Sequence, residues 1–351
     1  MTMNDPIAGI GSGGRVTLAH GGGTAMRDLI ERLFLASFHP QGFPVQEDQA
    51  RFDLAALAGH GDRLAFTTDS FVVEPLEFAG GDIGKLAVCG TLNDLAVGGA
   101  RPVALSAAFI IEEGLELETL RRIVTSMASQ AAAAGVSIVT GDTKVVPRGA
   151  CDRLFITTTG IGVIAEAHHV SIAAARPGDV ILVNGPLGDH GAAILCARGD
   201  LALGVSIESD CAPLHDLAAT LLAAVPQVRA MRDATRGGLA GVLTELAEAS
   251  RVAVTIEEKA LPLRPEVAGL CEILGLDPLY LANEGKLVAV VPQEAAEVAL
   301  AALRAHPLGA GAAIIGRVAD AGRAGDVTLL NRFGGHRAVT MPAGEQLPRI
   351  C

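Results

Sequence analysis

Short β-prone runs alternate with helical, small-residue segments along this chain, and the alternation is the strongest restriction on its fold. Strands are predicted at residues 63–69, 136–140, 153–162, 180–183 and 287–291, and helices at 84–96, 117–134, 192–197 and 239–250. Hydrophobic residues make up 50% of the chain but aromatic residues only 3%, and tryptophan is absent. We therefore expect an aliphatic core and a mixed α/β (α+β) fold.

The length of 351 residues exceeds what one ordinary hydrophobic core holds, so two domains are expected. Pro177-Gly178 is a turn signal between the two halves, and it sets the predicted domains at 1–175 and 176–340. Residues 341–351 contain two prolines and no apolar periodicity. This last segment is predicted to be a flexible, extended tail.

Charge and hydropathy exclude several classes of protein. The net charge is -12 and no basic run occurs, which argues against a nucleic-acid partner. No run of about 18 uninterrupted apolar residues is present, so neither a membrane span nor a membrane partner is expected. The first residues lack the pattern of a signal peptide. We expect a cytoplasmic protein.

The last residue of the chain is a cysteine. The sequence has 6 cysteines and no C-x-x-C pair, so a zinc site is not expected. Five of them, such as Cys89 and Cys196, have small or apolar neighbours and are predicted to be buried as small hydrophobes. Cys351 has no following chain to cover it, and it is the candidate reactive thiol.

Three acids in the first half share a setting of small and hydroxyl neighbours. Asp69, Asp94 and Asp142 are expected where strands or loops end. Carboxylates in such places suit Mg²⁺ bound with nucleotide phosphates, and Lys144 would neutralise phosphate charge. Each acid alone fits a helix cap or a turn better than a metal site. Their recurrence favours the site.

The second half has two further candidates. Asp233 precedes Arg236-Gly237-Gly238 and a predicted helix, an arrangement that suits an anion site, although Asp233 or Thr235 capping the helix fits equally well. Glu284 stands just before a predicted strand and is a candidate general base. A surface turn with a weak Glu284–Lys286 ion pair is the alternative.

Glycine-rich and acidic stretches near the start leave further alternatives open. His20 to Gly23 fits a mobile lid over phosphates or a flexible start, and Gln46 to Gln49 fits a further metal ligand. The run from Gly185 to Gly191, between a strand and a helix, fits a glycine loop or an ordinary tight turn.

Together these segments resemble one family along almost the whole chain, the HypE family of hydrogenase maturation factors. This family belongs to the superfamily of aminoimidazole ribonucleotide synthetase and selenophosphate synthetase. The matching segments are Glu47–Arg51, Thr68–Ser70, Gly80–Lys85, Asn93–Leu95, Gly141–Lys144, Gly188–Gly191, Arg232–Gly238, Asn283–Lys286 and Pro348–Cys351. The Asp and Gly motifs indicate the ATP-binding superfamily, and the Pro-Arg-Ile-Cys ending selects this member.

The resemblance implies a fold and an activity. The first domain would bind ATP and form a homodimer through its sheet, with a second α/β domain behind it. The carbamoyltransferase HypF would carbamoylate the terminal thiol. ATP-dependent dehydration would then give a thiocyanate, which the HypC–HypD complex would accept as a cyanide ligand for the iron of a [NiFe] hydrogenase.

The resemblance also assigns site residues, and ATP and Mg²⁺ as cofactors. The catalytic residues would be Cys351 as nucleophile and carrier, Lys144 at the oxygen that is phosphorylated, and Glu284 as the base. The cofactor-binding residues would be Asp48, Asp69, Asn93, Asp94, Thr140, Gly141, Asp142 and Asp233. Of these, Asp48, Asp69, Asp94, Asp142 and Asp233 would hold the metal.

Two other functions remain compatible with the motifs. A small-molecule phosphotransferase would keep ATP and Mg²⁺ and remain active without the tail. A non-catalytic carrier would dock partners through the tail and would not turn over ATP.

Overall fold

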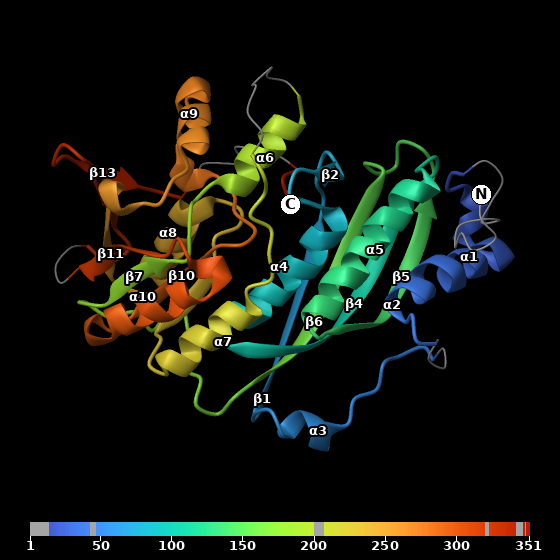
Figure 1. Ribbon diagram of the computed structural model, residues 1–351, viewed down its shortest axis with the longest axis horizontal. Helices are drawn as coiled ribbons and strands as arrows, with labels where there is room; N and C mark the ends of the chain where they lie inside the picture. The colour runs from blue at the N-terminus through green and yellow to red at the C-terminus, as the bar shows by residue number, and fades with distance from the viewer. Residues whose placement is uncertain (1–13, 43–46, 200–206, 320–322, 342–346, 348) are drawn as a thin grey trace.

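The computed structural model describes residues 14–42, 47–199, 207–319, 323–341, 347 and 349–351. It has two mixed α/β domains side by side, and α4 (Ile83–Val97) lies where they meet (Figure 1). None of the helices in the described ranges is long and apolar enough to cross a membrane.

The first domain is built on a four-stranded sheet with strand order β1-β6-β4-β5. Its strands are β1 (Arg63–Phe71), β4 (Ala100–Glu112), β5 (Ser137–Val146) and β6 (Leu154–Ile164). β6 pairs antiparallel with β1 and β4, whereas β4 and β5 are parallel. The parallel pair needs a crossover, and α5 (Leu117–Ala133) provides it. A small hairpin of β2 (Glu77–Phe78) and β3 (Gly81–Asp82) leads into α4.

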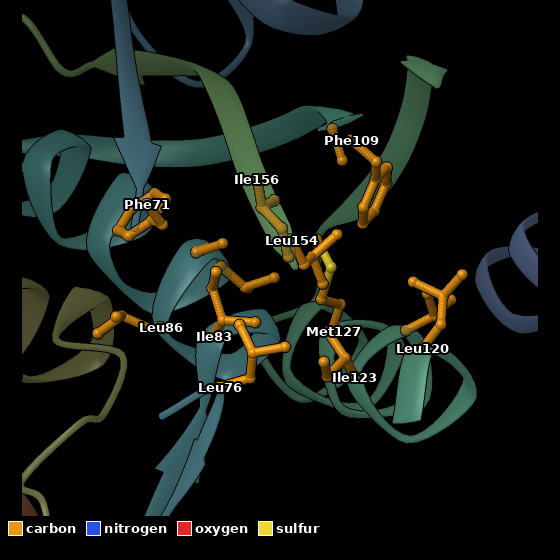
Figure 2. Packing of buried hydrophobic residues seen from close by; sticks show 14 of the residues in the cluster. Phe71, Leu76, Ile83, Leu86, Phe109, Leu120, Ile123, Met127, Leu154 and Ile156 are labelled. Atoms are coloured by element: carbon orange, nitrogen blue, oxygen red, sulfur yellow. The ribbon is translucent and has the colours of Figure 1, made fainter. Parts of the chain in front are cut away.

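Helices α4 and α5 cover only one face of this sheet. Figure 2 shows the core between these helices and the sheet. Ile83 and Leu86 of α4 and Met127 of α5 pack there with Phe71 and Ile156 from the strands. The side chains are mainly aliphatic, as the composition predicts. Asp82 caps α4 by accepting the amide hydrogens of Gly84 and Lys85 at 2.7 and 3.0 Å.

The other face of this sheet, which we call the outer face, is exposed. Its residues come from alternate positions of all four strands: Leu64, Phe66, Thr68, Ser70, Ser106, Ala108, Ile110, Thr140, Asp142, Lys144, Thr157 and Thr159. Phe66 is 72% exposed and Leu64 61% exposed. Large apolar side chains gathered on one uncovered sheet face indicate an interaction surface.

The second domain has a seven-stranded sheet with strand order β13-β12-β9-β11-β7-β10-β8. Its strands are β7 (Val180–Val183), β8 (Ala230–Asp233), β9 (Ala253–Glu257), β10 (Leu287–Val291), β11 (Ala313–Ala319), β12 (Val327–Leu330) and β13 (His336–Val339). One face packs on α8 (Gly238–Ser250), and the other on α7 (His215–Ala224) and α10 (Ala296–Ala305). The helices α6 (Asp189–Ala197) and α9 (Pro265–Leu274) form a further apolar cluster.

The chain is helical close to the start of its described part, so the unstructured start that was one alternative for His20 to Gly23 is wrong, and the lid over phosphates stays a prediction. A short 3-10 helix spans Leu18–Gly21, and His20 in it is 1% exposed. It continues into α1 (Gly23–Leu29), a π-helical turn (Ile30–Leu35) and α2 (Ala36–Phe38), and α3 (Leu54–Ala58) follows further along the chain.

Most predicted elements are confirmed, since each predicted strand and helix coincides with an observed one to within a few residues, apart from β5, which runs on to Val146. The expected positions of three acids are wrong. Asp69 and Asp142 lie inside β1 and β5, and Asp94 lies inside α4, so none of them ends an element. β1 and β5 extend further than their apolar patterns, because backbone pairing continues past the polar residue, whereas Asp94 lies inside the helix that the sequence predicts at 84–96.

The end of the chain lies against the body of the protein. Ile350 is 3% exposed and belongs to the first core, and Leu347 and Cys351 pack against that core. Gln46 and Pro348, which belong to two of the sequence motifs, lie outside the described residues.

Gly316 in β11 offers a test of the second sheet. A Cβ at this position would stand 2.2 Å from the carbonyl oxygen of Thr255 on β9, so Gly316→Ala must push two paired strands apart. We expect a loss of about 1–3 kcal/mol in the free energy of unfolding, measured by urea denaturation. The matched control is Gly269→Ala in α9, where nothing lies within 4 Å of the new Cβ. It should stabilise by roughly 0.5–1 kcal/mol. Equal effects of the two variants would contradict this packing.

Candidate functional site

Four of the predicted acids come together where the two domains meet. Asp69 on β1 points towards α4, since a Cβ on Gly90 would stand 4.0 Å from Asp69 Oδ2. Asp94 on α4 accepts a 2.6 Å hydrogen bond from Thr67 Oγ1 on β1. Asp233 ends β8, and Glu284 lies just before β10, the neighbouring strand. We call Asp69, Asp94, Asp233 and Glu284 the acid cluster.

Burial and mutual repulsion raise the pKa values in the acid cluster. Burial raises the pKa of Asp69 to about 6, with a further contribution from the charge of Asp94, while Arg236 acts in the opposite direction. Burial raises the pKa of Asp233 to about 7, again with the charge of Asp94 adding to it. These carboxylates therefore lie in a site that favours protons or cations.

Glu284 is the most strongly perturbed member of the acid cluster. Its side chain is 2% exposed, and its Oε1 atom has no hydrogen-bond partner. Burial, with the charges of Asp210 and Asp233, raises its pKa well above the ordinary value. The alternative of a surface ion pair with Lys286 is wrong, because Lys286 Nζ instead lies 2.8 Å from Asp210 Oδ2.

Asp210 fixes the backbone around Glu284. Its carboxylate accepts the amide hydrogens of Glu284 and Gly285 at 3.0 and 3.2 Å. A Cβ on Gly285 would stand 1.9 Å from the carbonyl oxygen of Asp210, so this close approach requires glycine. The bonds are made to the backbone of Glu284, and Oε1 of its carboxyl is left without a partner.

Asn93 connects α4 to the same loops. Its Nδ2 donates to the carbonyl oxygens of Ala212 and Glu284 at 3.1 and 3.2 Å, and its Oδ1 accepts from the amide of Leu214 at 2.7 Å. The Asn93 amide, predicted for cofactor binding, is thus engaged in holding the two domains together.

Asp142 and Lys144 do not lie in the acid cluster. They form an exposed ion pair of 2.9 Å on the outer face, and the Lys144 hydrogen bond lowers the pKa of Asp142. The strand register puts Asp69 in line with Thr158, Ala107 and Gly141, all on the helix-covered face. β5 is also three strand spacings, roughly 14 Å, from β1. Within one chain, Lys144 and the acid cluster are therefore separated by the sheet.

A cavity of about 490 Å³ lies beside β5 and contacts other predicted residues. Thr140, Gly141 and Asp142 line one side, and the Glu47–Phe52 segment lines another except at Asp48. The apolar wall includes Ile30, Phe34, Phe38 and Phe109. This size and lining suit a small-molecule ligand with a flat apolar part. Asp48 is exposed between Glu47 and Gln49, on this side of the domain.

The capping alternatives are wrong for the acids described here. Helix α8 begins after Gly237, whose φ of 79° is left-handed, and no side chain caps it. Asp233 lies in β8 and is not a cap. The loop before α6, in which the run from Gly185 to Gly191 begins, has a structural role at its start. Asn184 there donates hydrogen bonds to the carbonyl oxygens of Gly285 and Leu308.

The acid cluster fits a magnesium ion that is held together with nucleotide phosphates. Within the described ranges, no three His, Cys, Asp or Glu side chains stand close enough to hold a metal ion by themselves. Mg²⁺ usually takes one or two carboxylates and completes its shell with phosphate and water. The raised pKa values of Asp69 and Asp233 are what such a cation would relieve.

Sequence reasoning missed Asp210 and the role of His190. Asp210 has no periodic or glycine-rich neighbours, and its importance depends on a contact with Lys286, 76 residues away. The signal available in the sequence was Lys286, the lysine of the Glu284 motif. His190 lies in a motif that the sequence shows, but its contact with the tail comes only from the fold.

Replacing Asp233 by asparagine should stabilise the protein in a pH-dependent way. A neutral Asp233 contributes fully below its ordinary pKa of 3.8, and this contribution is lost as the pH rises through about 7. Asp233→Asn should therefore raise the free energy of unfolding at pH 8 by about 2 kcal/mol, with the shift discounted for a half-buried group, and by little at pH 4.5. Urea denaturation without ligands measures both.

The exposed Asp28 on α1 provides the control, because Asp28→Asn should change stability by the same small amount at both pH values. A pH-independent effect of Asp233→Asn would contradict the perturbed environment.

Comparisons with known proteins identify the family of this chain. Residues 46–164 match the family model of the AIR synthase related protein N-terminal domain, and residues 176–327 match that of its C-terminal domain. The chain is 65% identical over 338 residues to carbamoyl dehydratase HypE of Rhodobacter capsulatus, covering 96% of this chain and 98% of the relative.

Two solved structures are similar to the whole fold. The crystal structure of the hydrogenase maturation protein HypE in complex with ATP is 49% identical, with a TM-score of 0.89, over 95% of this chain and 99% of that one. The HypE chain of a HypE–HypF complex is 50% identical, with a TM-score of 0.77, over 80% and 90%.

Proposed function

This chain belongs to the HypE family of the AIR synthase superfamily, and from that premise we propose that it is an ATP-dependent carbamoyl dehydratase acting on its own Cys351. The product would be a thiocyanate that supplies the cyanide ligands of iron in [NiFe] hydrogenase maturation. The observation that carries the proposal is Glu284, a buried carboxyl with a raised pKa and an unpartnered oxygen beside three further acids.

The reaction requires an oxygen to leave and two protons to be removed. The carbamoyl oxygen attacks the γ-phosphorus of ATP and releases ADP. The carbon–oxygen bond then breaks as phosphate departs, and nitrogen loses both protons to leave a carbon–nitrogen triple bond. The sum is thiocarbamate and ATP giving thiocyanate, ADP and phosphate.

Glu284 is the proposed base for the nitrogen protons. A carboxyl with a raised pKa is a stronger base than an ordinary one, and its optimum lies near the pH at which it works. The charges that raise its pKa include those of Asp210 and Asp233. A cation in the acid cluster would bring this pKa down and free Glu284 to accept a proton.

ATP is the proposed co-substrate, and the ATP complex of a relative supports it. The apolar cavity beside β5 would take the base, next to Thr140, Gly141 and Asp142. Gly141 is required there, since a Cβ would stand 2.0 Å from the carbonyl oxygen of Ala107. Asp48 would contribute to nucleotide binding on one side of the nucleotide. Asn93 would contribute on the other side, by holding the loops around Ala212 and Glu284 in place.

Magnesium is proposed as the cation. Its proposed ligands are Asp69, Asp94 and Asp233 in the acid cluster and Asp48 and Asp142 near the cavity. When bound, it would supply positive charge that offsets the charge developing on the phosphates. Asp69 and Asp94 would hold it, and the charge of Asp69 also contributes to the raised pKa of Glu284.

A homodimer would complete the site. The outer face carries Phe66 and Leu64, which are 72% and 61% exposed, and both β1 and β5 are edge strands. If two outer faces pack together with the partner subunit's β5 beside the β1 edge, Lys144 of the partner subunit would approach the acid cluster around that edge, whereas within one chain the sheet lies between them. Lys144 would then steady the oxygen that is phosphorylated.

Partners follow from the chemistry of the tail. The thiol must first receive a carbamoyl group, and the complex of a relative with HypF supports HypF as the donor. The nitrile must leave to an acceptor, for which we propose the HypC–HypD complex. These steps belong in the cytoplasm.

Mass spectrometry of the C-terminal peptide tests the activity. With HypF, carbamoyl phosphate and ATP, the peptide should gain a carbamoyl group and then lose one water. Cys351→Ser should remove both changes. Glu284→Gln should retain carbamoylation and slow the loss of water by at least about 100-fold, because the base is neutralised. A carbamoyl adduct that ATP leaves unchanged in the wild type would rule out the dehydratase. Turnover of ATP with a small-molecule acceptor after removal of the tail would favour a phosphotransferase.

Mixed dimers test whether two chains share one site. Lys144→Ala and Glu284→Gln should each be nearly inactive alone. Co-expressed in equal amounts, they should recover about a quarter of wild-type activity, because half of the dimers are mixed and each has one intact site. No recovery would place both residues in one chain's site. A co-expressed mixture of Glu284→Gln and Glu284→Ala serves as the control and should stay inactive.

A further inference from the structure

The last three residues are bound by a defined set of donors. His190 Nε2 lies 2.7 Å from the carbonyl oxygen of Ile350. The carbonyl oxygen of Arg349 accepts from Arg198 Nη2 at 2.9 Å and from the Glu74 amide at 3.2 Å. Both peptide carbonyls that precede Cys351 are therefore hydrogen-bonded to the body of the protein.

The hydrogen bonds of His190 fix its tautomer. A carbonyl oxygen only accepts, so Nε2 carries the proton, and Nδ1 then accepts from Ser209 Oγ at 2.8 Å. Ser209 Oγ in turn accepts from the amide of Cys211 at 3.1 Å. His190 is fully buried, and the edge of its ring packs against Phe78. Both ring nitrogens of His190 are hydrogen-bonded, and the bond from Nε2 is made to the tail.

The bound tail has a conformation that a free chain rarely adopts. Arg349 has a φ of 56°, in the left-handed region that residues other than glycine seldom occupy. Its guanidinium is bonded to Asp152 at 2.9 Å, and the side chain of Ile350 is 3% exposed. We call the groups that bind the tail, namely His190, Arg198, Asp152 and the Glu74 amide, the dock. The dock therefore selects one conformation of the tail.

The dock is continuous with the segment that carries Glu284. The amide of Gly188, at the start of the His190 turn, donates to Asn283 Oδ1 at 2.7 Å, and the amide of Gly191 donates to the carbonyl oxygen of Ala282 at 3.0 Å. Ser209 is next in sequence to Asp210, which holds the Glu284 backbone. The residues that bind the tail and those that position the proposed base thus share one framework.

We propose that His190, supported by Ser209 and Arg198, is the positioning residue that latches the tail in this dock and presents Cys351 from it. His190 does not touch the reacting atoms. It sets how the tail divides between the docked position, used for dehydration, and a released position, used for carbamoylation. This inference deepens the proposed function, because the latched thiol is the proposed carrier.

Alkylation of Cys351 by iodoacetamide, followed peptide by peptide with mass spectrometry, tests the latch on the full chain. It needs neither ATP nor a carbamoyl donor, so a failure of the dehydratase proposal would not affect it. His190→Ala leaves a buried carbonyl without its donor, and alkylation of Cys351 should become about tenfold faster. His190→Gln retains an amide donor and should restore most of the protection. His336→Ala, at an exposed position on β13, is the matched control and should have no effect.

The buried thiols of Cys89, Cys211 and Cys271 report on folding in the same experiment. If His190→Ala exposes these three thiols, the experiment uses Arg198→Gln in place of His190→Ala. Arg198→Gln removes the donor to the Arg349 carbonyl oxygen without opening the core. Wild-type alkylation of Cys351 in either folded variant would overturn the proposal. With the partner present, His190→Ala should also speed carbamoylation while slowing ATP-dependent water loss. A residue with a purely structural role would slow both.

Discussion

The buried ion pair between Asp210 and Lys286 is the interaction on which the site depends. Their side chains are 4% and 8% exposed, so both charges have lost their hydration. Such a pair contributes little net stability unless further hydrogen bonds complete it. Here the amide hydrogens of Glu284 and Gly285 do so. Burial alone would raise the pKa of Asp210, but the charge and hydrogen bond of Lys286, with the Glu284 amide, hold it below its usual value. The two amide bonds also fix the backbone of Glu284 and leave its carboxyl unpaired.

An unpaired carboxyl beside three others is costly for the folded chain. Burial and repulsion raise the pKa of Asp69 and Asp233 to about 6 and 7, which means that the fold disfavours their charged forms. The cost is relieved when cations enter the site. An arrangement that is unfavourable alone and favourable with Mg²⁺ and a partner lysine would couple ligand binding to stability. This coupling also explains how Lys144 can lie outside the acid cluster of its own chain. The repulsion among the acids would then be relieved by Mg²⁺ and by the lysine of the partner subunit.

The sequence was sufficient for most of the fold because the strands and helices are short, aliphatic and clearly periodic. It failed at Asp69, Asp94 and Asp142, which it placed at the ends of elements, because side-chain polarity does not end a strand whose backbone stays paired with its neighbour or a helix that is packed. The grouping of Asp69, Asp94, Asp233 and Glu284 depends on tertiary contacts between residues up to 215 positions apart, which the resemblance supplied and periodicity did not. No local pattern marks Asp210, and no pattern indicates which face of β5 carries Lys144.

As a carrier, the tail would be recognised mainly through its backbone. The dock binds the backbone carbonyls of Arg349 and Ile350, which any sequence possesses, and adds one apolar contact and one ion pair. Backbone binding in a left-handed conformation is selective for geometry and modest in strength, because part of the hydrogen-bond energy is offset by the unfavourable φ of Arg349. A carrier must leave its dock in every cycle. A rigid dock that binds a strained tail therefore meets both requirements, accurate positioning while bound and release between steps.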